Sequence, residues 1–350
     1  MRRVTTLAAA VCAAALVLTS CGGSNDDTTT TPKGDTSSSA AASDIKVGLA
    51  YDIGGRGDQS FNDAAAAGLD KAKTELGVQT NEAEASNGEA LSAKEERLRA
   101  LASAGFNPVI AVGFAYSASV AKVAKELPDT QFAIIDDAAA VGDNIANLLF
   151  AEEQGSFLVG AAAALKSKSG NIGFVGGVEV PLIKKFEAGY TAGAKAANPD
   201  VKVQVTYLTQ PPDFSGFGDP AKGKTAAAGM YDAGADVVYQ AAGGSGGGVF
   251  EAAKDAGAFA IGVDSDQYNT ADPAVKDVII TSMLKKVDVA VFDFIQSVVD
   301  GKFAAGPVTY DLAKDGVGYS TSGGKIDDIT TQLEDYKKQI IAGDITVPTE

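Results

Sequence analysis

The sequence predicts an α/β protein built from two doubly wound lobes, each with a parallel sheet. Strand candidates alternate with helical patterns nearly throughout the chain, and this alternation is typical of parallel sheets joined by right-handed crossovers. The alternation restarts after residue 150, and residues 44–350 are together too long for one domain of average size. We therefore expect two lobes of the same class.

The first twenty residues have the features of an export signal. Arg2 and Arg3 precede an apolar run over residues 4–18, which is too short to span a bilayer as a mature helix. The run leads into "LTSC" at 18–21, which resembles the bacterial lipobox. We expect residues 1–20 to be removed and lipid to be attached to Cys21. The alternative is an ordinary signal peptide followed by a chance cysteine.

The next segment, residues 21–43, is predicted to be a disordered tether. It is rich in Thr, Ser, Ala and Gly and has too few apolar residues to form a core. The only other cysteine, Cys12, would be lost with the signal. The mature protein is therefore expected to fold without a disulfide.

The elements of the two lobes follow from hydrophobic periodicity. In the first half, strands are expected at 45–53, 78–84, 108–113, 131–136 and 144–150, with helices at 61–76, 91–104 and 116–126. In the second half, strands are expected at 171–177, 202–208, 235–242 and 259–264, with helices at 153–167, 181–197, 220–233 and 248–257. A further apolar run, "IITSM" at 279–283, reads as a strand.

The composition excludes several kinds of chemistry. The formal net charge of −16 opposes nucleic-acid binding, which requires Lys and Arg to displace phosphate counterions. The chain has no His, so Ser-His-Asp catalysis and His-based zinc sites are excluded. It also has no Trp, so any ring that stacks on a ligand must be Phe or Tyr. Carboxylate and Lys chemistry remain possible.

Ligands of open α/β sheets collect at the carboxyl ends of the strands, so the residues that follow each strand are the candidates. After the first strand comes the glycine-rich "DIGGRGDQSFN" at 52–62. Asp52 could bind a ligand or brace this loop, whereas Asp58 is expected to order its turn. Phe61 could stack on a base and Asn62 could bond to the base edge, or Phe61 could simply anchor a helix start capped by Ser60.

Two further strands end in a carboxylate. Asp136 ends "FAIID" and could accept a hydrogen bond from a purine N–H, although a turn cap is the alternative. Asp264 ends "AIGVD", and its two oxygens match the 2′- and 3′-hydroxyls of a ribose. We expect both to face a ligand.

The run "GGSGGG" at 243–248 could suggest a dinucleotide-binding loop. That fingerprint needs Gly at its first, third and sixth places, and from Gly244 the sixth place is Val249. We instead expect Gly243 and Gly244 to let backbone amides approach a sugar hydroxyl. Close packing of helix against sheet is the alternative.

Several of these segments together resemble one family. "DIGGRGDQSFNDAAAAGL", "FAIIDD", "LLFAEEQGSFLVGAAAAL", "GNIGFVGGVEVPLIKKFEAGYTAGAKAANPD", "GGSGGGVFEAAKDAG", "AIGVDSDQ" and "TSMLKKVDVAV" occur in the order found in the basic membrane protein family of ABC transporter substrate-binding lipoproteins. The resemblance runs from about residue 45 to 303 and includes the purine nucleoside receptor lipoproteins. It implies the fold of type I periplasmic binding proteins, with a three-segment hinge. The implied lobes are 44–150 plus 282–304 and 151–281 plus 305–350.

The resemblance also implies roles for site residues. It favours Phe61 and Asn62 as ligand contacts and places an aromatic residue, Phe186, against the other face of the base. From spacing alone, Phe186 would be a core residue with Leu182 and Tyr190. It favours Lys285 over the adjacent Lys286 as a donor to the ribose beside Asp264.

From these features we expect a non-enzymatic, lipid-anchored solute receptor on the extracytoplasmic face of the cell membrane, with no metal, no cofactor and no catalytic residue. It would bind a nucleoside, with purines favoured, act as a monomer and deliver its ligand to an ABC permease. One alternative is a sensor lipoprotein that reports a nucleoside or sugar without transport. Another is a nucleoside-cleaving enzyme, but such enzymes need a calcium ion held by a dense Asp cluster, and the first loop has only Asp52 and Asp58.

Overall fold

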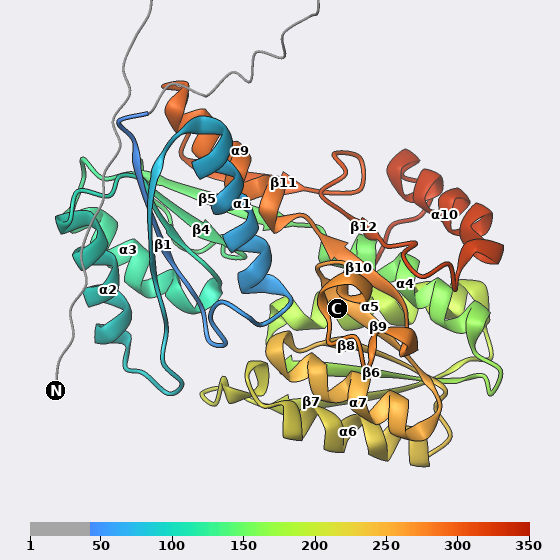
Figure 1. Ribbon diagram of the computed structural model, residues 1–350. Coiled ribbons are helices and arrows are strands. Elements are labelled where there is room, and N and C mark those ends of the chain that lie inside the picture. Colours follow the sequence, from blue (N-terminus) through green and yellow to red (C-terminus); the bar gives the residue numbers. More distant parts are fainter. Residues whose placement is uncertain (1–42) are drawn as a thin grey trace, which may run out of the picture. The chain divides into compact units, whose positions relative to one another are not determined.

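The computed structural model describes residues 43–350, which form two six-stranded sheets with helices on both faces (Figure 1). The first sheet has the strand order β11-β5-β4-β3-β1-β2 and the second has the order β12-β10-β9-β8-β6-β7. All pairings are parallel except that of β10 with β12. The expected doubly wound α/β fold is confirmed. The signal sequence, Cys21 and nearly all of the expected tether lie outside the described residues.

Ten of the strands lie close to their expected positions, whereas the last two, which lie after residue 305, were not expected. Those of the first sheet are β1 (Lys46–Ala50), β2 (Gln79–Ala83), β3 (Val109–Ala111), β4 (Phe132–Ile135), β5 (Ile145–Phe150) and β11 (Gly306–Tyr310). Those of the second are β6 (Asn171–Val178), β7 (Lys202–Thr209), β8 (Val237–Ala241), β9 (Phe259–Asp264), β10 (Ile279–Lys285) and β12 (Val317–Tyr319).

Seven of the α-helices lie close to their expected positions, whereas the last three, which lie after residue 265, were not expected. Those around the first sheet are α1 (Phe61–Leu76), α2 (Leu91–Ser103), α3 (Ser117–Glu126) and α9 (Val287–Val299), with a short 3-10 helix, η1 (Phe114–Tyr116), before α3. Those around the second are α4 (Glu152–Lys166), α5 (Pro181–Ala197), α6 (Pro220–Asp232), α7 (Gly246–Ala256), α8 (Gln267–Thr270) and α10 (Thr330–Ala342). The remaining 3-10 helices are η2 (Ser215–Phe217), η3 (Gly243–Ser245), η4 (Lys276–Val278) and η5 (Asp327–Ile329). No helix within residues 43–350 is long and apolar enough to cross a membrane.

Strand β1 shows how the sequence pattern builds the two-faced core. Val47 and Leu49 point to one face and belong to the cluster that includes Leu69 of α1. Ala50 points to the other face and packs in a cluster with Leu98 of α2. Since alternate residues of a strand face opposite sides, a strand covered by helices on both faces is apolar at nearly every position.

The chain changes sheet at positions that differ from two expected boundaries. The first crossing, between β5 and α4, lies close to the expected residue 150. β10, however, stays in the second sheet through Lys285, which pairs with Val317. α9 then packs against α1, and β11 pairs with β5, so the return to the second sheet follows Tyr310. The expected boundaries at 281 and 304 are therefore too early, because "TSMLK" completes β10 and "GPVTY" forms an unrecognised edge strand.

Candidate ligand-binding site

Residues from both sheets line a pocket at the carboxyl ends of the strands. It encloses about 560 Å³ of empty space, including its open mouth, which is within the range of small-molecule sites. The expected residues that line it are Asp52, Phe61, Asn62, Asp136, Phe186, Gly243, Asp264 and Lys285. Gly244 does not line the pocket, although it is adjacent to Gly243 in η3. Eight of the nine expected ligand-binding residues therefore line the pocket.

The glycine-rich loop before α1 is organised by Asp58. Its carboxylate accepts hydrogen bonds from the backbone N–H groups of Ser60, Asn62 and Asp63 at 2.9–3.1 Å. These are N–H groups at the start of α1 that have no partner within the helix. Asp58 therefore shapes the turn, and Ser60, expected as the N-cap, makes no capping bond with its side chain.

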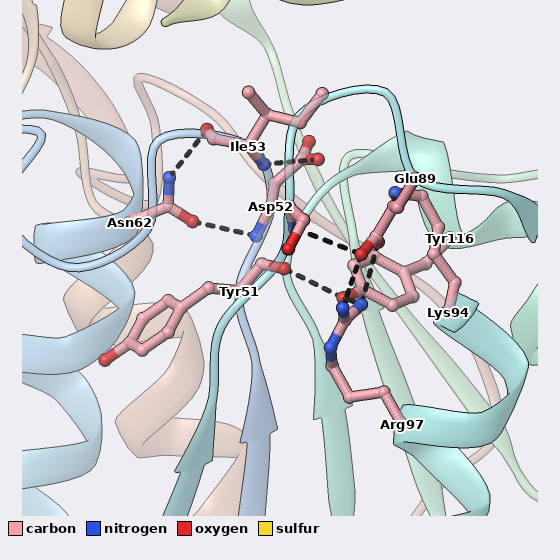
Figure 2. Close-up of polar contacts among 9 residues, drawn as sticks. Tyr51, Asp52, Ile53, Asn62, Glu89, Lys94, Arg97 and Tyr116 are labelled. Carbon is pink, nitrogen blue, oxygen red and sulfur yellow. Dashed lines mark hydrogen bonds and ion pairs between the residues drawn. The ribbon is translucent and has the colours of Figure 1, made fainter.

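Asn62 braces the same loop (Figure 2). Its Oδ1 accepts from the Asp52 N–H at 3.0 Å, and its Nδ2 donates to Asp58 Oδ2 at 3.0 Å and to the Ile53 carbonyl at 3.4 Å. The donor groups of the amide are thus bonded within the loop. The expected bond from Asn62 to a base edge would have to use the second lone pair of Oδ1.

Asp52 projects from the end of β1 into the pocket. Its Oδ1 accepts from the Ile53 N–H at 2.8 Å. Its Oδ2 lies where a side chain at position 113 would stand, so only Gly113 leaves room for it. Burial raises the pKa of Asp52 to about 6, against the lowering effects of the Ile53 N–H and the charge of Lys94.

Lys285 is the buried cation of the pocket, with only 2 % of its side chain exposed. It forms an ion pair with Asp136, and its Nζ lies 3.5 Å from Glu152 Oε1. Burial opposes its charge, but the surrounding carboxylates of Asp136, Glu152 and Asp264 raise its pKa. Lys286 is half-buried and does not line the pocket, so Lys285 is the lysine that faces it.

Aromatic rings surround the Lys285 ammonium group. Its Nζ lies 4.9 Å from the ring centre of Phe61, 5.1 Å from that of Phe150 and 5.6 Å from that of Phe186. Phe61 is half-buried at the start of α1, whereas Phe186 is buried on α5. Both rings line the pocket, together with Phe114 and Phe217. The pocket therefore offers flat apolar faces as well as charge.

Asp136 and Asp264 follow or end strands β4 and β9 with backbone φ angles of 65° and 62°. This left-handed region is unfavourable for most residues but tolerated by Asp and Asn. Asp264 Oδ2 accepts from Ser60 Oγ at 2.7 Å across the two lobes, and Asp136 Oδ1 is buried without a hydrogen-bond partner among the described residues. Burial raises the pKa of both carboxyls. Two carboxylates thus bring unused acceptor capacity into the pocket.

The sequence reasoning missed several residues. Glu152 is buried, beside Lys285 and 3.3 Å from Lys185, and it starts α4 directly after β5. The strand-end rule could have indicated it, because two adjacent glutamates follow an apolar strand. The apolar lining residues Ile53, Leu182, Ile183, Phe217, Ala241 and Val263 carry no sequence signal that distinguishes them from core.

A pocket between two α/β lobes is consistent with the proteins that this chain resembles, which are solute-binding proteins. Residues 45–350 match the family model described as ABC transporter substrate-binding protein PnrA-like. The chain belongs to this PnrA-like family. The family and fold are those of solute-binding proteins and not of enzymes.

Relatives of the PnrA-like chain cover most of its length. It is 36 % identical to the CD4+ T-cell-stimulating antigen of Listeria monocytogenes, over 88 % of this chain and 89 % of the relative. It is 34 % identical to the ABC transporter nucleoside-binding protein BmpA of Lactococcus lactis, over 88 % and 90 % of the two chains. A relative in Pyrococcus abyssi, 36 % identical over 79 % of this chain and 69 % of the relative, is named as a lipoprotein.

A solved structure supports the fold. An ABC transporter solute-binding protein from Aeropyrum pernix is 33 % identical and superposes with a TM-score of 0.76, covering 87 % of this chain and 94 % of the other. The expected family and the type of fold are therefore both confirmed.

Proposed function

We propose that this PnrA-like protein captures a nucleoside, preferably a purine nucleoside, between its two lobes for import by an ABC permease. One observation carries the proposal: buried carboxylates from both sheets and the buried Lys285 meet aromatic rings in a single pocket. A nucleoside offers the matching chemistry, because it joins a flat heterocycle with ring N–H groups to a sugar diol. The printed name of the Lactococcus relative supports the same ligand class.

The roles follow from position. Phe61 and Phe186 would contact the faces of the base, and Asp52 and Asp136 would accept from its N–H groups. Asp264 would accept from the ribose diol, with Lys285 donating nearby. Gly243, with its positive φ of 55°, would let the backbone approach the sugar. Asn62 would act mainly by holding the loop that carries Phe61 and Asp52, and Gly244 would support the turn from outside the pocket.

We further propose that Cys21 carries a lipid anchor, which keeps the protein on the extracytoplasmic face of the membrane. The lipobox-like "LTSC" and the lipoprotein name of the Pyrococcus relative support this. The anchored protein would act as a monomer beside its permease. Its pairing with a permease follows from the function of the family.

Isothermal titration calorimetry of the purified protein tests the ligand. Inosine, guanosine, adenosine and cytidine are compared with hypoxanthine and ribose. We expect tight binding of purine nucleosides, weaker binding of cytidine and much weaker binding of base or sugar alone, because each fragment forms only part of the contacts. Equal affinity for ribose and inosine would contradict the proposal.

Uptake measurements separate import from sensing. Deletion of the gene should abolish uptake of radiolabelled inosine at concentrations near the Kd. Unchanged uptake together with tight binding would favour a sensor.

A further inference from the structure

The peptide group between Tyr51 and Asp52 is held by side chains on both of its sides (Figure 2). Tyr116 Oη donates to the Tyr51 carbonyl at 2.8 Å, and the Asp52 N–H donates to Asn62 Oδ1 at 3.0 Å. Tyr116 and Asn62 come from different elements, η1 and α1. The direction in which the Asp52 side chain leaves β1 is therefore fixed by two separate parts of the first lobe.

Behind Tyr116 lies a group of three charged side chains, Glu89, Lys94 and Arg97, which we call the Glu89 cluster. Arg97 Nη1 and Lys94 Nζ both donate to Glu89 Oε1 at 2.9 Å. Arg97 Nη1 also donates to Tyr116 Oη at 2.6 Å. Only 6 % of the Glu89 side chain, 9 % of Lys94 and 12 % of Arg97 are exposed. The cluster thus anchors the same phenol that holds the Tyr51 carbonyl.

The Glu89 cluster does not touch the space that a ligand would occupy, since none of its three residues lines the pocket. It contains two cations and one anion and so carries one surplus positive charge. Buried charge is costly unless it is compensated nearby. Asp52 is buried and ionisable, and the positive charge of Lys94 acts on its carboxylate.

The charged and titratable groups that face Asp52 come from several elements. Lys94 on α2 favours its ionised form, whereas Glu89 before α2 and Asp58 in the loop favour the neutral form. Tyr116 on η1 faces it as well and stays neutral, because burial raises its pKa well above the usual range. With burial as the largest effect, the pKa of Asp52 is about 6, so it is mainly ionised at neutral pH.

We propose that the Glu89 cluster consists of positioning residues for Asp52, which fix the direction of its carboxylate through Tyr116 and keep it ionised through the charge of Lys94. The pocket then presents a hydrogen-bond acceptor at neutral pH and loses it on acidification. Affinity for a ligand that donates an N–H or O–H to Asp52 falls as the pH drops through about 6. Only the identity of that ligand rests on the proposed function.

The test has a first arm that needs no ligand. The side-chain carboxyl of Asp52 is followed by carbon-13 NMR from pH 4 to 9 in the unliganded protein, and its resonance is identified by its absence in Asp52→Asn. Lys94→Met removes a cation and should raise the titration midpoint by on the order of one pH unit. Glu89→Gln removes the anion and should lower the midpoint.

The double variant Glu89→Gln/Lys94→Met keeps the surplus of one positive charge on Arg97 and should return the midpoint close to that of the parent. Lys122→Met is the matched control, since Lys122 lies on α3, is 56 % exposed and pairs with Glu95. It should leave the midpoint unchanged. Midpoints that do not move, or that move in the same direction in both single variants, would show a purely structural role and overturn the proposal.

The second arm measures inosine affinity by calorimetry across the same pH range. The pH at which affinity falls should shift with the NMR midpoint, upward in Lys94→Met and downward in Glu89→Gln. If the titration midpoint moves in opposite directions in the two single variants but inosine does not bind, the positioning role is sustained and the proposed function is refuted. Circular dichroism checks the fold of each variant. If Lys94→Met is unfolded, the proposal is tested by Glu89→Gln alone, in which the titration midpoint of Asp52 should fall.

Discussion

At the scale of single residues, Lys285 is surrounded by more carboxylates than its single positive charge can neutralise. It faces Asp136 and Glu152 directly, and the charge of Asp264 also reaches it. A buried cation among several carboxylates leaves acceptor oxygens that no side chain satisfies, and such groups are costly until a donor arrives. The ligand proposed here should therefore be rich in hydrogen-bond donors, as nucleosides are.

The first residue-scale prediction concerns Asp264. Asp264→Asn should tolerate the positive φ but lose the charge that strengthens two bonds to the ribose diol. We expect a loss of about 2–3 kcal/mol, or roughly 30- to 150-fold in inosine affinity by calorimetry. 2′,3′-Dideoxyinosine serves as the control and should bind parent and variant alike. A parental inosine affinity would make Asp264 a turn residue only.

Phe61 gives the second residue-scale prediction. Phe61→Ala removes a ring that stacks on the base, which we expect to cost roughly 1–3 kcal/mol by analogy with stacking on nucleic-acid bases. Calorimetry should show inosine binding weakened roughly 5- to 150-fold, with the weak binding of free ribose nearly unchanged. Equal losses for inosine and ribose would mean that Phe61 acts through the fold.

At the scale of elements, α4 and α5 approach each other through glycines. A Cβ at Gly189 would overlap the Glu153 backbone, and one at Gly160 would overlap the Tyr190 backbone. The same helices carry Glu152, which lies beside Lys285, and Phe186, which lines the pocket. The close approach therefore sets the distance between a buried carboxylate and a ring that lines the site.

The element-scale prediction is that Gly189→Ala forces α5 away from α4. Overpacking of this kind costs about 1–3 kcal/mol of unfolding free energy, and Phe186 lies one turn away, so inosine affinity should fall as well. Gly229→Ala is the matched control: this glycine is exposed within α6 and a Cβ there meets nothing within 4 Å. It should be neutral or stabilise by roughly 0.5–1 kcal/mol. Urea unfolding measures the change in unfolding free energy in both variants, and equal changes would refute the packing argument.

At the scale of the whole molecule, the lobes are joined by their crossings and by side-chain bonds across the pocket. Ser265 Oγ donates to the Ser60 carbonyl at 3.0 Å, and Gln267 Nε2 donates to the Gln59 carbonyl at 2.9 Å. These bonds bring the loop before α1 against the second lobe. Because that loop also carries Phe61, opening the lobes would withdraw the ring from the pocket.

The whole-molecule prediction concerns the membrane. Cys21→Ala should prevent lipid attachment, so that the protein moves from the detergent phase to the aqueous phase in Triton X-114 partitioning. Cys12→Ala, within the expected signal, is the control and should leave the partitioning unchanged. Retention of the Cys21→Ala variant in the detergent phase would refute the lipid anchor.

Most of the architecture could be predicted because parallel strands buried on both faces leave a strong apolar signal, as in β3 and β4. The edge strand β11 does not: it reads "GPVTY", contains a proline and is partly exposed, so its sequence resembles a loop. In the site, Asp136 and Asp264 could be predicted from strand ends. The engagement of Asn62 within its own loop could not, since it depends on the three-dimensional path of the glycine-rich turn.

The strand orders of the two sheets make the two halves of the pocket similar but not identical. β4 and β9 occupy the same place in their sheets, and each leads to an aspartate with positive φ, so the two lobes contribute matching acids. The neighbouring strands β5 and β10 also correspond, but one ends in Phe150 and the other in Lys285. Phe150 does not line the pocket, and its ring lies 5.1 Å from the Lys285 ammonium group, so at this position only the second lobe brings a charge to the ligand. Near-duplicate halves that differ in this way favour a single pose for the bound molecule.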